Sequence, residues 1–95
     1  MVVSLNNCIA KNKKIPWRIV EGEAILVDVD KGEVIHLNPV GAEIWNSIDG
    51  KKSVKEIIEH ICNQFEVDKE NAEEDTFKFL ERLHENDAIE CLKIP

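Results

Sequence analysis

The chain has 95 residues, of which 43% are hydrophobic and 33% are charged, so we expect one soluble globular domain with a core of modest size. No apolar run approaches the roughly 20 residues that span a bilayer, and the N-terminus lacks the apolar stretch of a signal peptide. These features exclude a membrane protein and favour a cytoplasmic location. The net charge is −7, but residues 1–20 carry +4, so the remainder carries the difference, −11. An acidic body repels phosphate backbones, which argues against nucleic acid as a partner.

Residues 1–15 show weak hydrophobic periodicity and carry Lys11, Lys13 and Lys14. We predict a flexible basic arm over this stretch, followed by a single domain over residues 16–92. The positive charge of the arm can attract an acidic partner, but a solvated terminal tail explains it equally well.

Three short segments rich in β-forming residues follow the arm: residues 17–20, 24–29 and 33–37. Short turns that contain glycine separate them. In the third segment, Ile35 and Leu37 share one face and Val34 and His36 share the other, because side chains alternate along a strand. The pattern predicts a three-stranded antiparallel meander.

The spacing of apolar residues then changes to that of helices. Asn38 is suited to cap a first helix, Ser53 and Glu56 form a capping box for a second, and Asp68 caps a third. We expect helices over residues 39–48, 54–65 and 69–86, and a short strand over residues 88–92. Strands followed by helices around one core predict an α+β fold that is winged helix-turn-helix-like.

Gly41 interrupts the first predicted helix, four residues before Trp45. A glycine inside a helix costs about 1 kcal/mol relative to alanine. We therefore expect another segment to pack closely against Gly41.

The sequence contains no constellation that would support catalysis or metal binding. Cys8, Cys62 and Cys91 form no CxxC motif, and their number and spacing predict free thiols rather than a disulfide framework. His60 lies two residues before Cys62 on a predicted helix, where the two side chains point in different directions. We therefore predict no enzyme activity, no metal and no cofactor.

Phe77 lies about 115° away from the centre of the apolar stripe of the third predicted helix. Together with Leu80 and His84 it forms a second strip of side chains beside that stripe. Phe77 either packs against the arm or a strand, or it forms one wall of a groove. The third strand would provide the other wall, because an unpaired strand edge is a template for an added strand.

The run from His36 to Trp45 (HLNPVGAEIW), followed by Asp49 and Gly50, resembles the PqqD-like family. Its members are recognition elements for ribosomally made, modified peptides. The resemblance spans residues 17–89. Further positions that match are Val54, Glu56, Ile57, Phe65, Val67, Asp75, Phe79, Leu80, Leu83, Ala88 and Ile89.

This resemblance implies a non-catalytic peptide chaperone, which binds the leader segment of a precursor peptide and presents it to a modifying enzyme, often a radical-SAM protein. It also implies that the leader adds as a strand beside the third strand and lies against the third helix. The contact residues implied for this chain are Val34, Ile35, His36, Leu37, Thr76, Phe77, Leu80 and His84. Asp75 matches a characteristic acid of that helix.

Family members that serve pyrroloquinoline quinone (PQQ) synthesis typically carry a tyrosine-proline-glutamate element before the third strand. This chain has no tyrosine, and the corresponding residues 29–33 read VDKGE. The difference favours a modified peptide other than the PQQ precursor.

Two other functions are compatible with the predicted elements. A winged-helix DNA-binding module would need a basic recognition helix, whereas the second predicted helix is mixed in charge and the third is acidic. A self-associating domain would pair the same strand edge with a second copy as a homodimer.

Overall fold

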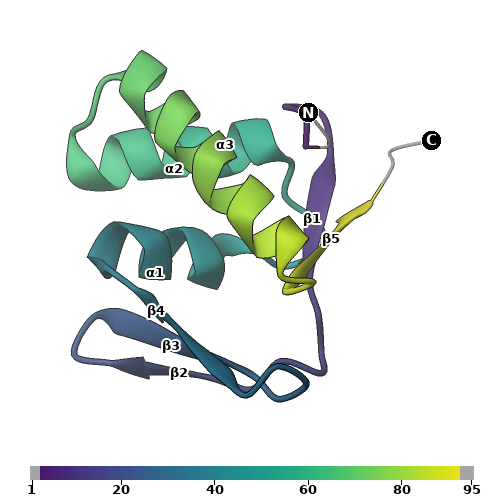
Figure 1. Cartoon of the computed structure of the whole chain (residues 1–95). Helices are drawn as coiled ribbons and strands as arrows, with labels where there is room; N and C mark the ends of the chain where they lie inside the picture. The colour runs from purple at the N-terminus through teal and green to yellow at the C-terminus, as the bar shows by residue number, and fades with distance from the viewer. Residues whose placement is uncertain (1–2, 93–95) are drawn as a thin grey trace.

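The structure is a computed structural model that describes residues 3–92. In chain order the elements are β1 (Cys8–Lys11), β2 (Trp17–Val20), β3 (Glu23–Asp28), β4 (Glu33–Leu37), α1 (Pro39–Ser47), α2 (Val54–Phe65), α3 (Lys69–Glu85) and β5 (Ile89–Leu92). The sheet β2-β3-β4 is antiparallel and covers one side of α1, while α2 and α3 lie on the other side (Figure 1). The predicted α+β fold, a three-stranded meander followed by three helices, is confirmed.

Residues 8–11 require a correction to the predicted flexible arm over residues 1–15. They form β1, which pairs antiparallel with β5 in a separate two-stranded sheet and sets Ile9 opposite Cys91. Ile9 is fully buried in the core, and Val3 is buried as well. A four-residue strand with one buried side chain gives almost no periodic signal, and its partner lies about 80 residues away in the sequence. Residues 1–2 of the predicted arm lie outside the described residues.

A two-residue turn joins β2 to β3. Its residues, Glu21 and Gly22, have φ angles of 51° and 81°. Two positive φ angles define the hairpin turn whose twist matches the flanking strands, and glycine adopts the second one without steric cost. The turn therefore fixes a register in which Trp17 lies opposite the buried Leu26.

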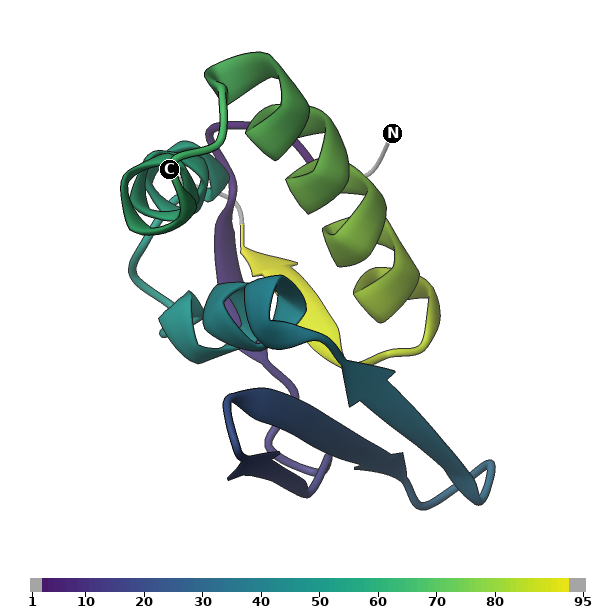
Figure 2. The ribbon, with the colours of Figure 1, turned by 90° about the vertical axis from the view of Figure 1, so that its left-hand side faces the viewer.

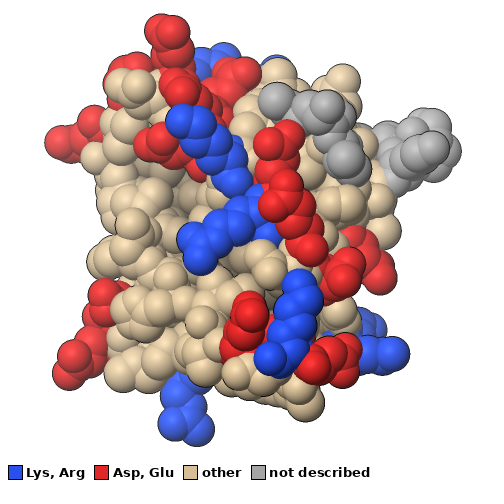
Figure 3. Space-filling model, in the orientation of Figure 1, with Lys and Arg blue, Asp and Glu red and all other residues tan. Residues whose placement is uncertain are grey.

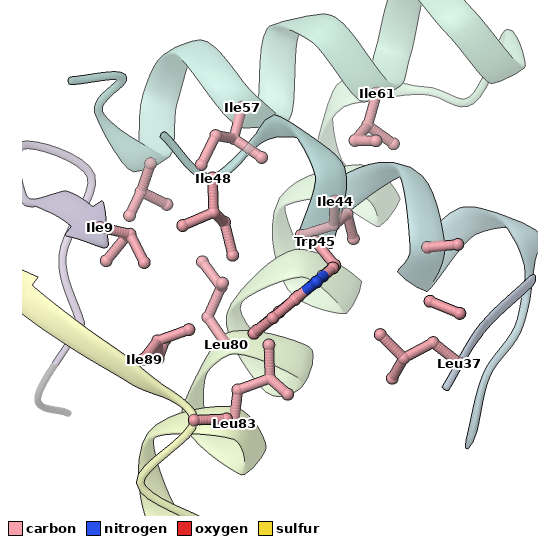
Figure 4. Packing of buried hydrophobic residues seen from close by; sticks show 14 of the residues in the cluster. Ile9, Leu37, Ile44, Trp45, Ile48, Ile57, Ile61, Leu80, Leu83 and Ile89 are labelled. Atoms are coloured by element: carbon pink, nitrogen blue, oxygen red, sulfur yellow. The ribbon is translucent and has the colours of Figure 1, made fainter. Parts of the chain in front are cut away.

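Trp45 lies at the centre of the hydrophobic core and is fully buried (Figure 4). The edge of its ring meets Trp17 of β2 at a centroid distance of 6.0 Å. The ammonium group of Lys11 lies 4.6 Å from the Trp17 ring centroid and 5.4 Å from that of Trp45. Burial lowers the pKa of Lys11, and the neighbouring Asp49 opposes that shift. Lys11 thus connects β1 to the meander through cation–π contacts.

The three predicted helix caps are present. Asn38 accepts a hydrogen bond from the Gly41 amide at 2.8 Å, and Ser53 and Glu56 form a reciprocal capping box. Asp68 accepts hydrogen bonds from the side chain and amide of Asn71, which lower its pKa. Each cap satisfies amide groups that have no partner within the helix. The capping signals therefore placed the start of every helix correctly.

Thr76 of α3 is fully buried, and its hydroxyl has no hydrogen-bond partner among the described residues. A buried polar group without a partner costs roughly 1–3 kcal/mol. We therefore expect Thr76→Val, which keeps the shape and removes the hydroxyl, to raise the free energy of unfolding by about 1 kcal/mol in urea denaturation. Thr76→Ala serves as the control and should destabilise the protein, because it leaves a cavity. A clear loss of stability in Thr76→Val would show that the hydroxyl is hydrogen-bonded.

Candidate functional site

The hydrogen-bonding direction of β3 determines which groups of β4 are free. The amide of Val27 donates to the carbonyl of Pro16 at 2.9 Å, on the β2 side. Backbone groups of an antiparallel strand alternate in direction from residue to residue. Leu26 therefore directs its N–H and C=O groups toward β4.

β4 is the last strand of its sheet, and no other strand pairs with its outer side within residues 3–92. Ile35 lies opposite Leu26, so the backbone groups of Ile35 bond inward to β3. By the same alternation, Val34 and His36 direct their N–H and C=O groups outward. The free edge of β4 thus offers two donors and two acceptors to an added strand.

The side chains of β4 alternate as the sequence predicted. Ile35 and Leu37 face the core and are 9% and 2% exposed. Val34 is 65% exposed, and the His36 side chain is 59% exposed and lies 3.7 Å from Glu23. An added strand therefore has an apolar floor on one side of the sheet and exposed side chains on the other.

Phe79 of α3 lies beside the junction of β4 and α1. A Cβ atom placed on Gly41 would lie 3.2 Å from Cε1 of Phe79 and 3.4 Å from Cβ of Leu37. The glycine is thus required by close packing, as expected from its position inside a helix. Phe79 is only half-buried, so it provides an apolar wall next to the end of the free edge. The sequence interpretation did not select Phe79, although Gly41 was a signal of its contact.

Phe77 and His84, by contrast, lie on the other flank of α3. Residues two apart on a helix point about 160° apart, so Phe77 and Phe79 face different neighbours. Phe77 lies in an open groove of about 730 Å³ along α3. His84 lines a smaller hollow with Val3 of the N-terminal segment. The structure therefore does not bring these two predicted contact residues to β4.

Thr76 and Leu80 are each 0% exposed and belong to the core. Their side chains cannot touch a bound chain without repacking. Of the residues predicted for the helix wall, none is both exposed and near β4. The four residues predicted on the strand do form one edge.

Figure 2 shows β4 at the margin of the sheet, on the same side of the molecule as α3. On this side, charged side chains follow α3, whereas the surface over α1 and β4 is largely uncharged (Figure 3). The free edge therefore opens onto a mainly uncharged surface.

Within the part of the chain that the structure describes, no group of three or more His, Cys, Asp or Glu residues could hold a metal ion. Burial raises the pKa of the Cys91 thiol, the reverse of the shift that activates a catalytic cysteine. No helix among residues 3–92 is long and apolar enough to cross a membrane.

Comparison with known families identifies the group to which this edge belongs. The family described as Coenzyme PQQ synthesis protein D (PqqD) matches residues 23–89, which is more than half of the chain. The chain belongs to the PqqD family. The matched region contains β3, β4 and all three helices, so it includes the free edge and Phe79. The resemblance inferred from the sequence is thereby confirmed.

A solved structure of a similar protein is that of TbiB1 in complex with the TbiA(beta) leader peptide. The two chains are 26% identical with a TM-score of 0.77, over 85% of this chain and 94% of that one. No curated protein sequence matches this chain significantly.

Proposed function

We propose that this PqqD-family protein binds the leader segment of a ribosomally made precursor peptide and presents it to a separate modifying enzyme, without catalysing a reaction itself. The observation that carries the proposal is the free edge of β4, in a chain whose structural relative TbiB1 is bound to a leader peptide. A radical-SAM protein or another peptide-modifying enzyme would be the second partner.

In this proposal the leader is extended and pairs with β4 through the outward backbone groups of Val34 and His36. Backbone pairing provides affinity that depends little on the leader's sequence. Specificity then comes from alternate leader side chains, because every second one faces the apolar floor at Ile35 and the ring of Phe79. We expect the leader to place an apolar side chain against Phe79.

The product of the pathway is proposed to be a modified peptide other than PQQ, because this chain lacks the tyrosine-proline-glutamate element. A cytoplasmic location is part of the same proposal and is supported by three unpaired cysteines. Nucleic acid is not favoured, since the helix beside the edge, α3, has six acidic and three basic residues.

Calorimetric titration with synthetic leader peptides, taken from precursors encoded beside this gene, tests the proposal. We expect one of them to bind at one-to-one stoichiometry with a dissociation constant of about 1 µM or lower. If none of these leaders binds, the proposed function is wrong.

We predict that Phe79→Ala weakens leader binding about tenfold, because it removes the apolar wall next to the edge. Phe77→Ala is the matched control, two residues away on the opposite flank of α3, and should change the affinity less than about twofold. Circular dichroism and thermal unfolding confirm that both variants are folded. The reverse pattern would restore the helix wall that the sequence predicted around Phe77.

A further inference from the structure

The face of the sheet that points away from α1 carries an apolar patch. We call it the outer sheet face; its side chains, by strand alternation, are Arg18, Val20, Glu23, Ile25, Val27, Val34 and His36. Val20 is 44% and Val34 is 65% exposed, while Ile25 and Val27 are half-buried. All three helices lie on the opposite side of the sheet (Figure 1). The solvent face of an antiparallel sheet is ordinarily polar, so four aliphatic side chains here indicate a surface that becomes covered.

Charge identifies the occupant that fits this face. The whole chain carries −7, so two copies repel each other over most of their surfaces. The outer sheet face is balanced, however, with the cation of Arg18 on β2 and the carboxylate of Glu23 on β3. A patch with one cation, one anion and an apolar centre is complementary to itself under a two-fold rotation.

The shape of the face agrees with this assignment. An open groove of about 330 Å³ lies on the β2–β3 part of the sheet and is lined by Pro16, Trp17, Arg18, Ile25 and Val27. The protruding Val20 belongs to the same face. In a two-fold arrangement, an aliphatic side chain of each copy can fill the groove of the other, as in face-to-face sheet packing.

We propose that a second copy of this chain packs against the outer sheet face and forms a two-fold symmetric dimer that leaves the β4 edge free. Three strands about 4.8 Å apart and about 17 Å long cover a plane of roughly 240 Å², well below the roughly 800 Å² that each partner buries in a standard interface. The dimer is therefore weak and reversible.

The effect of a leader on this dimer rests on the proposed function. A leader that adds to β4 becomes a fourth strand and enlarges the face, so leader binding strengthens the dimer. A homodimer formed through the β4 edge, the alternative considered from the sequence, behaves in the opposite way, because leader and second copy then compete for the same backbone groups.

Sedimentation equilibrium of the full chain tests the dimer, at concentrations from roughly 10 µM to about 1 mM. We expect the mass to rise from 10.9 kDa toward twice that value. Val27→Lys should raise the dissociation constant at least about tenfold, because two like charges then meet at the two-fold axis. Leu92→Lys, at an exposed position on β5, is the control and should leave it unchanged.

A charge swap provides a second test at exposed positions that do not affect folding. Arg18→Glu alone should weaken the dimer several-fold, and the double variant Arg18→Glu with Glu23→Arg should restore it, since the face is again balanced. Failure of the double variant to restore the dimer would remove the charge argument.

Val34→Pro separates this inference from the proposed function. It should lose leader binding and still dimerise, because it alters the β4 edge and leaves the rest of the face intact. A protein that is monomeric at every concentration overturns the dimer even if leaders bind. A dimer that Val34→Pro or a leader dissociates, and Val27→Lys does not, places the contact at the edge instead.

Discussion

Val34→Pro is expected to weaken leader binding roughly a hundredfold, because it removes an outward amide and leaves a carbonyl of the leader unsatisfied. The proline ring also fills the space where the added strand would lie. The fold should survive, since the Val34 amide does not bond to β3 and the ladder uses Glu33, Ile35 and Leu37 instead. Titration calorimetry measures the loss, and thermal unfolding checks the fold.

Val34→Ala is the matched control for this variant. It shortens the same exposed side chain but keeps the amide, so leader affinity should stay within about threefold of the parent. If Val34→Pro is folded and binds the leader as tightly as Val34→Ala does, then the leader does not pair with this edge.

Ile9→Ala is expected to lower the free energy of unfolding by about 2–4 kcal/mol, because Ile9 is fully buried and its truncation leaves a cavity. That is a large share of the 5–15 kcal/mol typical of a small domain. Chemical denaturation in urea measures the change. The large expected effect reflects the place of β1 in the core.

Lys13→Ala is the control for this second prediction. Lys13 lies in the exposed turn after β1, so its truncation should change stability by less than about 0.5 kcal/mol. If Ile9→Ala were as harmless as Lys13→Ala, residues 1–15 would be a flexible arm, as the sequence alone suggested.

Local signals were sufficient to predict the meander and the helices. The caps at Asn38, Ser53 and Asp68 each act within three residues, and the alternation in β4 acts within five. Such interactions are visible in a sequence because both partners lie side by side in it. The free edge followed from them, since a short meander leaves its outer strands unpaired.

Long-range contacts could not be predicted in the same way. β1 is defined by its pairing with β5 at the far end of the chain, and neither strand has a pattern strong enough to identify the other. The helix wall is a related case. Periodicity singled out Phe77 because it lies off the apolar stripe, but only tertiary packing places Phe79 beside Gly41 and Leu37.

Residue-resolved amide hydrogen exchange, measured by NMR with and without a saturating leader peptide, tests the central claim most directly. We predict that the leader slows exchange at the amides of Val34 and His36, the two outward donors of β4. The other free edge of the meander, with outward amides at Trp17 and Ile19, should be unaffected. Slower exchange at Trp17 and Ile19 with no change at Val34 and His36 would contradict the account and place the leader on β2.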